Sequence, residues 1–215
     1  MKFRKTLSGL GLAAVLALSG CVSGGGPEIS RQIYTSEYGV VKDGGYTIPA
    51  VPIDRVPKRY HRQIVSYFTK EKPGTIIVNT KQRYLYFVLP GNRAVRYGIG
   101  VGRAGFAWEG EAYIKWKQPW PRWHPPKEMI AREPRLAKYA NGGQDPGLRN
   151  PLGARALYLF DKDGKDTLYR LHGSPEWKSI GTAASSGCIR LMNQDIIDLY
   201  SRVKPGKDAK VVVIQ

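Results

Sequence analysis

The amino-acid sequence predicts a mostly β domain with few helices. Short runs rich in Val, Ile, Tyr and Phe recur from residue 75 onward, and Pro, Gly and Asn turn signals separate them. A segment rich in Pro and Gly, residues 120–153, interrupts these runs and is longer than an ordinary connection. A helical stretch follows Asn193 near the C-terminus. We therefore expect a β-sandwich or barrel-like sheet with one or two short helices and a long lid loop.

Residues 1–20 have the features of an export signal peptide. A basic start (residues 2–5) precedes an apolar run (residues 7–18) that is too short to span a membrane permanently. The run ends at Leu18-Ser19-Gly20-Cys21, which resembles the lipobox of bacterial lipoproteins. This resemblance implies cleavage before Cys21 and lipid attachment to its thiol. It places the chain on the periplasmic side of a bacterial envelope, and Val22 favours anchoring to the outer membrane. The alternative is an ordinary signal peptide with a coincidental cysteine.

The chain is strongly basic. Its formal net charge is +17, and removal of the signal peptide lowers this to +14. In a cytosolic protein such a charge suggests nucleic acid. The export signal makes nucleic acid an unsuitable partner, so anionic envelope polymers, lipid head groups and the carboxylates of peptidoglycan stems are expected instead.

Residues 21–73 are expected to form a tether and N-terminal extension. Residues 23–27 are Gly-rich and predict a flexible linker. Tyr34, Tyr38 and Tyr46 are candidates for packing on the domain. The pattern over residues 57–69 predicts one short helix, which Lys72-Pro73-Gly74 would end.

The domain itself is expected over residues 74–215. Asn193 is expected to cap a helix over residues 194–203 with its side-chain oxygen. In the lid loop, Trp120, Trp123 and Tyr139 either cover a substrate and exclude water or anchor the loop by packing. The predicted strands lie at 75–79, 83–88, 94–101, 111–117, 156–160, 168–172 and 210–214.

Two short segments carry the candidate chemistry: Leu171-His172-Gly173-Ser174 and Ser185-Ser186-Gly187-Cys188-Ile189-Arg190. The chain has two cysteines, and lipidation would account for Cys21, so Cys188 is a free thiol in an export context. A thiol is a strong nucleophile only as the thiolate, which requires a nearby base or positive charge. His172 and Arg190 are the candidates. The alternative is that Cys188 is a small buried hydrophobe.

The order and number of these residues exclude some other classes of site. His172 precedes Cys188, whereas papain-like enzymes place the cysteine first. The chain's histidines, His61, His124 and His172, show no recurring ligand spacing. Neither a metal nor a cofactor is therefore expected.

The same residues resemble the YkuD-type L,D-transpeptidases, in particular their ErfK/YbiS/YcfS/YnhG branch. The resemblance covers about 140 residues from Gly74 to the end. Many members carry a second histidine where this chain has Ser186, which leaves His172 as the candidate base. The matching segments are His172-Gly173-Ser174, Ile180-Gly181, the segment from Ser185 to Asp195, Leu199-Tyr200, and upstream Asn150-Pro151-Leu152-Gly153 and Pro125-Pro126.

The resemblance implies a cysteine acyltransferase of peptidoglycan. Cys188 would attack the bond between an L-centre and D-Ala in a stem tetrapeptide, release D-Ala, and pass the acyl group to an amine. The acceptor would be a second stem, giving a 3→3 cross-link, an envelope protein, or a free D-amino acid, and water would make the enzyme a carboxypeptidase. The Gly173 carbonyl would orient His172.

The remaining site residues have expected roles around this pair. The N–H groups of Gly187 and Cys188, with that of Ser186, would form an oxyanion hole. Arg190 either binds a substrate carboxylate or braces the site. Ser185 would brace the loop, and Ser185 and Trp123 are further candidates for substrate contact. The alternative function is a catalytically inactive, lipid-tethered peptidoglycan-binding module.

Overall fold

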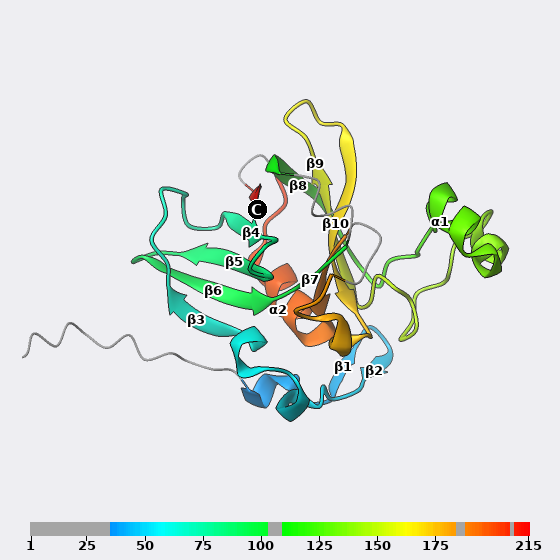
Figure 1. Cartoon of the computed structure of the whole chain (residues 1–215), viewed down its shortest axis with the longest axis horizontal. Coiled ribbons are helices and arrows are strands. Elements are labelled where there is room, and N and C mark those ends of the chain that lie inside the picture. Colours follow the sequence, from blue (N-terminus) through cyan, green and yellow to red (C-terminus); the bar gives the residue numbers. More distant parts are fainter. Residues whose placement is uncertain (1–34, 103–108, 184–187, 207–208) are drawn as a thin grey trace, which may run out of the picture.

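The computed structural model describes residues 35–102, 109–183, 188–206 and 209–215, and its main feature is a ten-stranded, strongly curled sheet (Figure 1). The strand order is β3-β6-β5-β4-β12-β8-β9-β10-β11-β7. β6 and β7 lie near opposite ends of this order, yet only Ile99 separates them along the chain. The sheet must therefore curl until its ends approach each other, as in a barrel. The predicted mostly β fold is confirmed.

The strands lie close to the apolar runs of the sequence, and some of these runs are buried along most of their length. β4 and β5 form the expected hairpin, while the run expected over 94–101 is divided into β6 and β7. The strands are β3 (Gln63–Ser66), β4 (Ile76–Asn79), β5 (Tyr84–Leu89), β6 (Arg93–Gly98), β7 (Gly100–Val101), β8 (Gly110–Pro119), β9 (Arg155–Phe160), β10 (Asp166–Ser174), β11 (Ile189–Met192) and β12 (Lys210–Ile214).

One hydrophobic core lies inside the curl. It combines side chains from both halves of the sheet with Ile196 and Leu199 of helix α2 (Asn193–Arg202), which are fully buried. In Figure 1, α2 lies between the two halves of the sheet. The long loop contains the short helix α1 (Lys127–Arg132) and the 3-10 helix η5 (Pro134–Tyr139), which project away from the sheet.

Two local predictions are wrong. Residues 57–69 do not form a helix of their own: they hold the 3-10 helix η3 (Lys58–Tyr60) and strand β3, because β3 pairs with β6 along the sheet edge. Asn193 does not cap α2, since the helix begins at Asn193 and its N-cap residue is Met192. The Asn193 side-chain oxygen instead accepts a hydrogen bond from the Ala154 N–H at 2.9 Å.

The described part of the extension packs on the domain. It contains 3-10 helices η1 (Thr35–Tyr38) and η2 (Ile53–Arg55) and a small hairpin of β1 (Val41–Asp43) and β2 (Tyr46–Ile48). Tyr38 is buried and lies in a cluster with Tyr60, Ile180 and Met192. Tyr34 lies outside the described residues.

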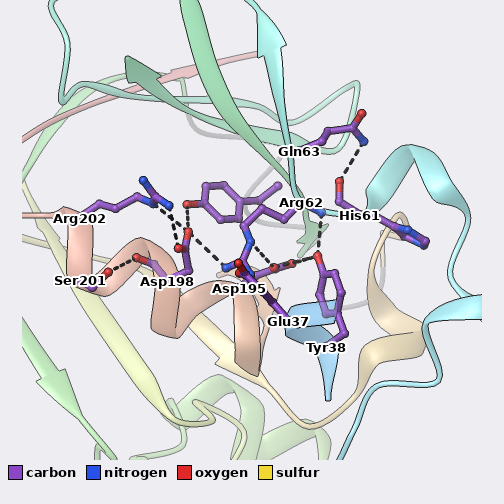
Figure 2. Close-up of polar contacts among 10 residues, drawn as sticks. Glu37, Tyr38, His61, Arg62, Gln63, Asp195, Asp198, Ser201 and Arg202 are labelled. Carbon is purple, nitrogen blue, oxygen red and sulfur yellow. Dashed lines mark hydrogen bonds and ion pairs between the residues drawn. The ribbon is translucent and has the colours of Figure 1, made fainter. Parts of the chain in front are cut away.

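Buried polar contacts fasten this extension to α2 (Figure 2). The Tyr38 hydroxyl donates to the Asp195 carboxylate at 2.9 Å and accepts the Arg62 backbone N–H at 2.7 Å. The buried Arg62 guanidinium forms ion pairs with Glu37, Asp195 and Asp198. The extension is thus bonded to the helix that directly follows β11.

Within the described ranges, no helix has the length and apolarity needed to cross a membrane.

Candidate active site

Two rows of side chains run across neighbouring strands on the face of the sheet opposite the core. Successive side chains of a strand alternate between faces, so residues two apart share one face. The strand register then sets which of them are neighbours. One row contains Trp116, Tyr158 and Arg170 on β8, β9 and β10; the second contains Gln118, Ala156, His172 and Arg190 on β8, β9, β10 and β11.

Cys188 joins the first row. It directly precedes Ile189, which pairs in parallel with Leu171, so Cys188 lies beside Arg170. The parallel pairing also places His172 beside Arg190. The two successive strands β10 and β11 therefore bring the predicted thiol, imidazole and guanidinium together.

These side chains open into a cleft of about 1100 Å³. His172, Cys188 and Arg190 line it from the sheet, and the lid loop lines it from the other side with Trp123 and Tyr139 among others. The lid loop and the candidate thiol therefore line the same cleft. Gln118 and Glu176 also line this cleft.

His172 is buried and held in one tautomer. Its Nδ1 lies 2.5 Å from the Gly173 carbonyl oxygen, which can only accept, so Nδ1 carries the proton and Nε2 is the basic nitrogen. Burial is the largest of the effects that lower the pKa of His172 to about 4; the Arg190 charge acts in the same direction, and the Gly173 and Pro151 carbonyls act against both. The imidazole is therefore neutral at pH 7.

Cys188 is a half-buried thiol that forms no disulfide within the described residues. Burial raises its pKa above the ordinary value, although a backbone hydrogen bond from Arg170 and the charges of Arg170 and Arg190 act in the opposite direction. The resting pair is therefore a neutral thiol beside a neutral imidazole. Thiolate formation at neutral pH therefore requires a base that takes the thiol proton.

Close glycine packing fixes the position of His172. A Cβ on Gly173 would lie 2.9 Å from Ile196 Cγ2 and still closer to the Asn193 side-chain oxygen. Gly153, with φ of +60°, is packed equally tightly against Gly173 and Asn193. These glycines let β10 and the end of the lid loop approach α2.

Arg190 and Arg170 occupy different electrostatic settings. Arg190 forms an ion pair with Glu176 at 3.3 Å, and the Glu176 side chain is largely exposed. Arg170 makes two hydrogen bonds to Asp166, at 2.6 and 2.7 Å. Arg170, Tyr158 and Trp116 were not singled out from the sequence, although the i, i+2 spacing of Arg170 and His172 is a usable signal.

The lid loop is anchored by buried polar contacts. The Asn150 side-chain amide donates to the carbonyls of Pro121, Gln144 and Asp145 at 3.0–3.2 Å. The backbones of Trp123 and Gln144 exchange two hydrogen bonds. Together these contacts hold the two ends of the loop beside each other.

The three lid aromatics have different roles. Trp120 is buried beside Tyr46 and donates to Asp43 at 2.7 Å, so it anchors the loop and does not cover the cleft. Trp123 and Tyr139 line the cleft and make an edge contact with each other. The packing alternative is thus correct for Trp120.

Some predicted residues lie outside the described residues: Ser185, Ser186, Gly187 and Cys21. Within the described ranges, no group of three or more His, Cys, Asp or Glu side chains could hold a metal ion. His61 is buried and its Nε2 donates to the Val56 carbonyl, while His124 lines the cleft.

Comparison with known proteins identifies the family. The YkuD family, described as the L,D-transpeptidase catalytic domain, matches residues 73–214. The probable L,D-transpeptidases YcfS and ErfK/SrfK of Escherichia coli K12 are each 32% identical to this chain, over 145 and 148 residues. Each alignment covers 64% of this chain and 43% of the relative, so the chain spans less than half the length of these relatives.

A solved structure supports the same fold. The crystal structure of a Brucella melitensis protein, described as a probable carnitine operon oxidoreductase caia, is 45% identical, with a TM-score of 0.51. The alignment covers 73% of this chain and 96% of that one. The family match includes every strand from β4 to β12 and both rows of the cleft. The chain therefore belongs to the YkuD family of L,D-transpeptidase catalytic domains.

Proposed function

We propose that this protein is a peptidoglycan L,D-transpeptidase with Cys188 as its nucleophile. The observation that carries the proposal is the hydrogen bond from His172 Nδ1 to the Gly173 carbonyl, in a cleft that Cys188 also lines. This bond leaves Nε2 unprotonated and therefore able to accept the thiol proton. A stem tetrapeptide with an L-centre–D-Ala bond is the donor.

The first half-reaction forms a thioester. Nε2 of His172 takes the proton from Cys188 Sγ as the sulfur attacks the carbonyl carbon of the L-centre. The tetrahedral intermediate collapses with cleavage of the C–N bond. The imidazolium returns the proton to the departing amine, so D-Ala leaves neutral at nitrogen and the acyl group remains on sulfur.

The second half-reaction reverses these proton movements. An acceptor amine attacks the thioester carbonyl and gives its proton to Nε2 of His172. The C–S bond breaks, the new amide forms, and the thiolate of Cys188 recovers the proton. The acceptor is a second stem, an envelope protein or a free D-amino acid.

Neighbouring groups would stabilise charge and position the donor. The backbone N–H groups of Ser186, Gly187 and Cys188 are proposed as the oxyanion hole. Arg190 is proposed to bind a stem carboxylate. Its present partner, Glu176, is largely exposed, and such pairs contribute little, so a substrate carboxylate could replace it at low cost.

Ser185 and Trp123 are proposed to contact the donor. Trp123 is supported by its place in the lid wall of the cleft. Exclusion of water by this wall would favour an amine over hydrolysis. We further propose that residues 1–20 are removed, that Cys21 is lipidated, and that residues 74–215 work on the periplasmic side, anchored to the outer membrane.

Mass spectrometry of muropeptides tests the proposed function. The purified full chain is incubated with disaccharide-tetrapeptide beside its Cys188→Ala variant. Dimers of the tetrapeptide minus D-Ala are expected with the wild type and not with the variant. Loss of D-Ala without dimers would indicate hydrolysis, exchange or a protein acceptor. No reaction with either chain, with the thiol intact, would favour the inactive peptidoglycan-binding module.

A further inference from the structure

Three planar side chains form a continuous stack on the cleft floor beside Cys188. The rings of Trp116 and Tyr158 have centroids 4.0 Å apart and are inclined by 22°. The Arg170 guanidinium lies over the other side of the stack, 4.5 Å from the Tyr158 ring centre. The register pairs Trp116 with Tyr158 and Tyr158 with Arg170, so the stack crosses three adjacent strands and reaches the strand position next to Cys188.

The Arg170 end of the stack is held in place by an ion pair with Asp166. Its two outer nitrogens donate to the two oxygens of Asp166 at 2.6 and 2.7 Å, and one of them also donates to the Tyr169 carbonyl at 2.8 Å. A planar bidentate pair of this kind fixes the guanidinium in one orientation. Arg170 therefore supports the stack, and its charge is already compensated within the protein.

The Trp116 end of the stack is open. Tyr158, which lies between its two neighbours, is 9% exposed, whereas Trp116 is 49% exposed. Half exposure is expected for an indole with one face covered by Tyr158 and the other face open to the cleft. Leu168, which is 76% exposed, extends the apolar surface of the same cleft. Exposed apolar surface inside a cleft indicates a ligand contact.

The distance from Trp116 to Cys188 matches the length of a donor stem. Adjacent strands lie about 4.8 Å apart, so three strand spacings separate the two residues by about 14 Å. Three extended stem residues connect the sugar to the scissile carbonyl and span about 10 Å. The ether-linked lactyl group between the sugar and the stem lengthens this connection by a few ångströms more. A sugar on Trp116 would therefore place its third stem residue at the thiol.

We propose that the open face of Trp116 binds the N-acetylmuramoyl ring that carries the donor stem, an inference that depends on the proposed function. The C–H face of a pyranose is flat and apolar and stacks on an indole. The stack would then hold the sugar at one end of the first row while Cys188 reacts at the other.

Binding measurements with matched ligands test this subsite without any turnover. The full chain carrying Cys188→Ala is titrated by calorimetry with disaccharide-tetrapeptide and, separately, with the free tetrapeptide. In this background, Trp116→Ala is expected to raise the Kd for the disaccharide-tetrapeptide about five- to tenfold. The Kd for the free tetrapeptide should change less than about twofold. Trp116→Phe, which keeps an aromatic face, should retain most of the affinity.

Phe68→Ala is the matched control, because Phe68 is 80% exposed and lies outside the cleft. It should change neither Kd. Equal weakening of both ligands by Trp116→Ala, or no weakening of either, would overturn the proposal. D-Ala release from the free tetrapeptide by the chain with Cys188 intact tests the proposed function separately. Failure of the sugar subsite would therefore appear in the Kd values, whereas failure of the proposed function would appear as absence of D-Ala release.

Discussion

Alanine at position 173 is expected to disturb the packing that positions His172. Gly173 lies in β10 and its φ is outside the left-handed region, so alanine causes no backbone strain there. The added Cβ would lie 2.9 Å from Ile196 Cγ2 and 3.2 Å from the Ala154 nitrogen, and closer still to the Asn193 side-chain oxygen. Either α2 or β10 must therefore move.

The cost of this movement follows from two contributions. Overpacking a buried site typically costs about 1–3 kcal/mol. Displacement of the Asn193 oxygen would also break its buried 2.9 Å hydrogen bond with the Ala154 N–H, and an unsatisfied buried group costs about 1–3 kcal/mol. Gly173→Ala should thus lower the free energy of unfolding by about 2–6 kcal/mol. A shift of His172 by about 1 Å would lower kcat about 100-fold.

Urea unfolding of the full chain, followed by circular dichroism, measures this loss. Gly142→Ala is the matched control, since no atom lies within 4 Å of a Cβ at that position. Adding Asn193→Ala to Gly173→Ala removes the closest obstacle, so the double variant should lose less stability than the sum of the two single variants. A Gly173→Ala protein within about 0.5 kcal/mol of the wild type, or strictly additive effects, would refute the reasoning.

Three further results are expected. Because burial lowers the pKa of His172 to about 4, kcat/KM should fall only as the pH approaches 4, and a limb near pH 6.5 in the pH–rate profile would contradict this. Burial raises the pKa of Asp195 to about 7, so between about pH 4 and 7 the folded state keeps a proton that the unfolded state releases. The free energy of unfolding should therefore fall as pH rises through this window, by up to about 1.4 kcal/mol per pH unit, and Asp195→Asn should lack this slope in urea titrations; equal slopes would refute it. Asn150→Ala removes the amide that holds both ends of the lid loop, so limited proteolysis within residues 121–149 should be faster than in the exposed-site control Asn141→Ala, and equal rates would exclude the anchoring role.

Most strands were predictable because their local pattern agrees with their tertiary environment. β4 and β5 are apolar runs on either side of a clear turn, and β12 is a short run of valines. Residues 63–66 were misassigned because pairing with β6, a distant contact, decides their conformation. Tertiary pairing of this kind overrides weak local preference.

The candidate residues of the site could be named from the sequence, whereas their arrangement in space could not. Cys188 and His172 could be identified from residue type and motif. Their arrangement in two rows depends on strand register, which a single sequence does not specify for distant strands. Trp116 was missed for this reason, since its neighbours Tyr158 and Arg170 become neighbours only after β8, β9 and β10 pair. Asn193 was assigned as a helix cap because its actual contact leaves no local sequence pattern. Its side-chain oxygen accepts a hydrogen bond from the Ala154 N–H, which lies far away in the chain.

Cys188 is proposed to carry the acyl group between donor and acceptor. The most direct measurement is peptide-level mass spectrometry of the acid-quenched reaction of the full chain with disaccharide-tetrapeptide and no added amine acceptor, with D-Ala release recorded in parallel for the Cys188→Ala variant. The expected result is an adduct of the donor minus D-Ala on the peptide that contains Cys188, and no D-Ala release by the variant. D-Ala release by Cys188→Ala at the wild-type rate, with no adduct on that peptide, would contradict it.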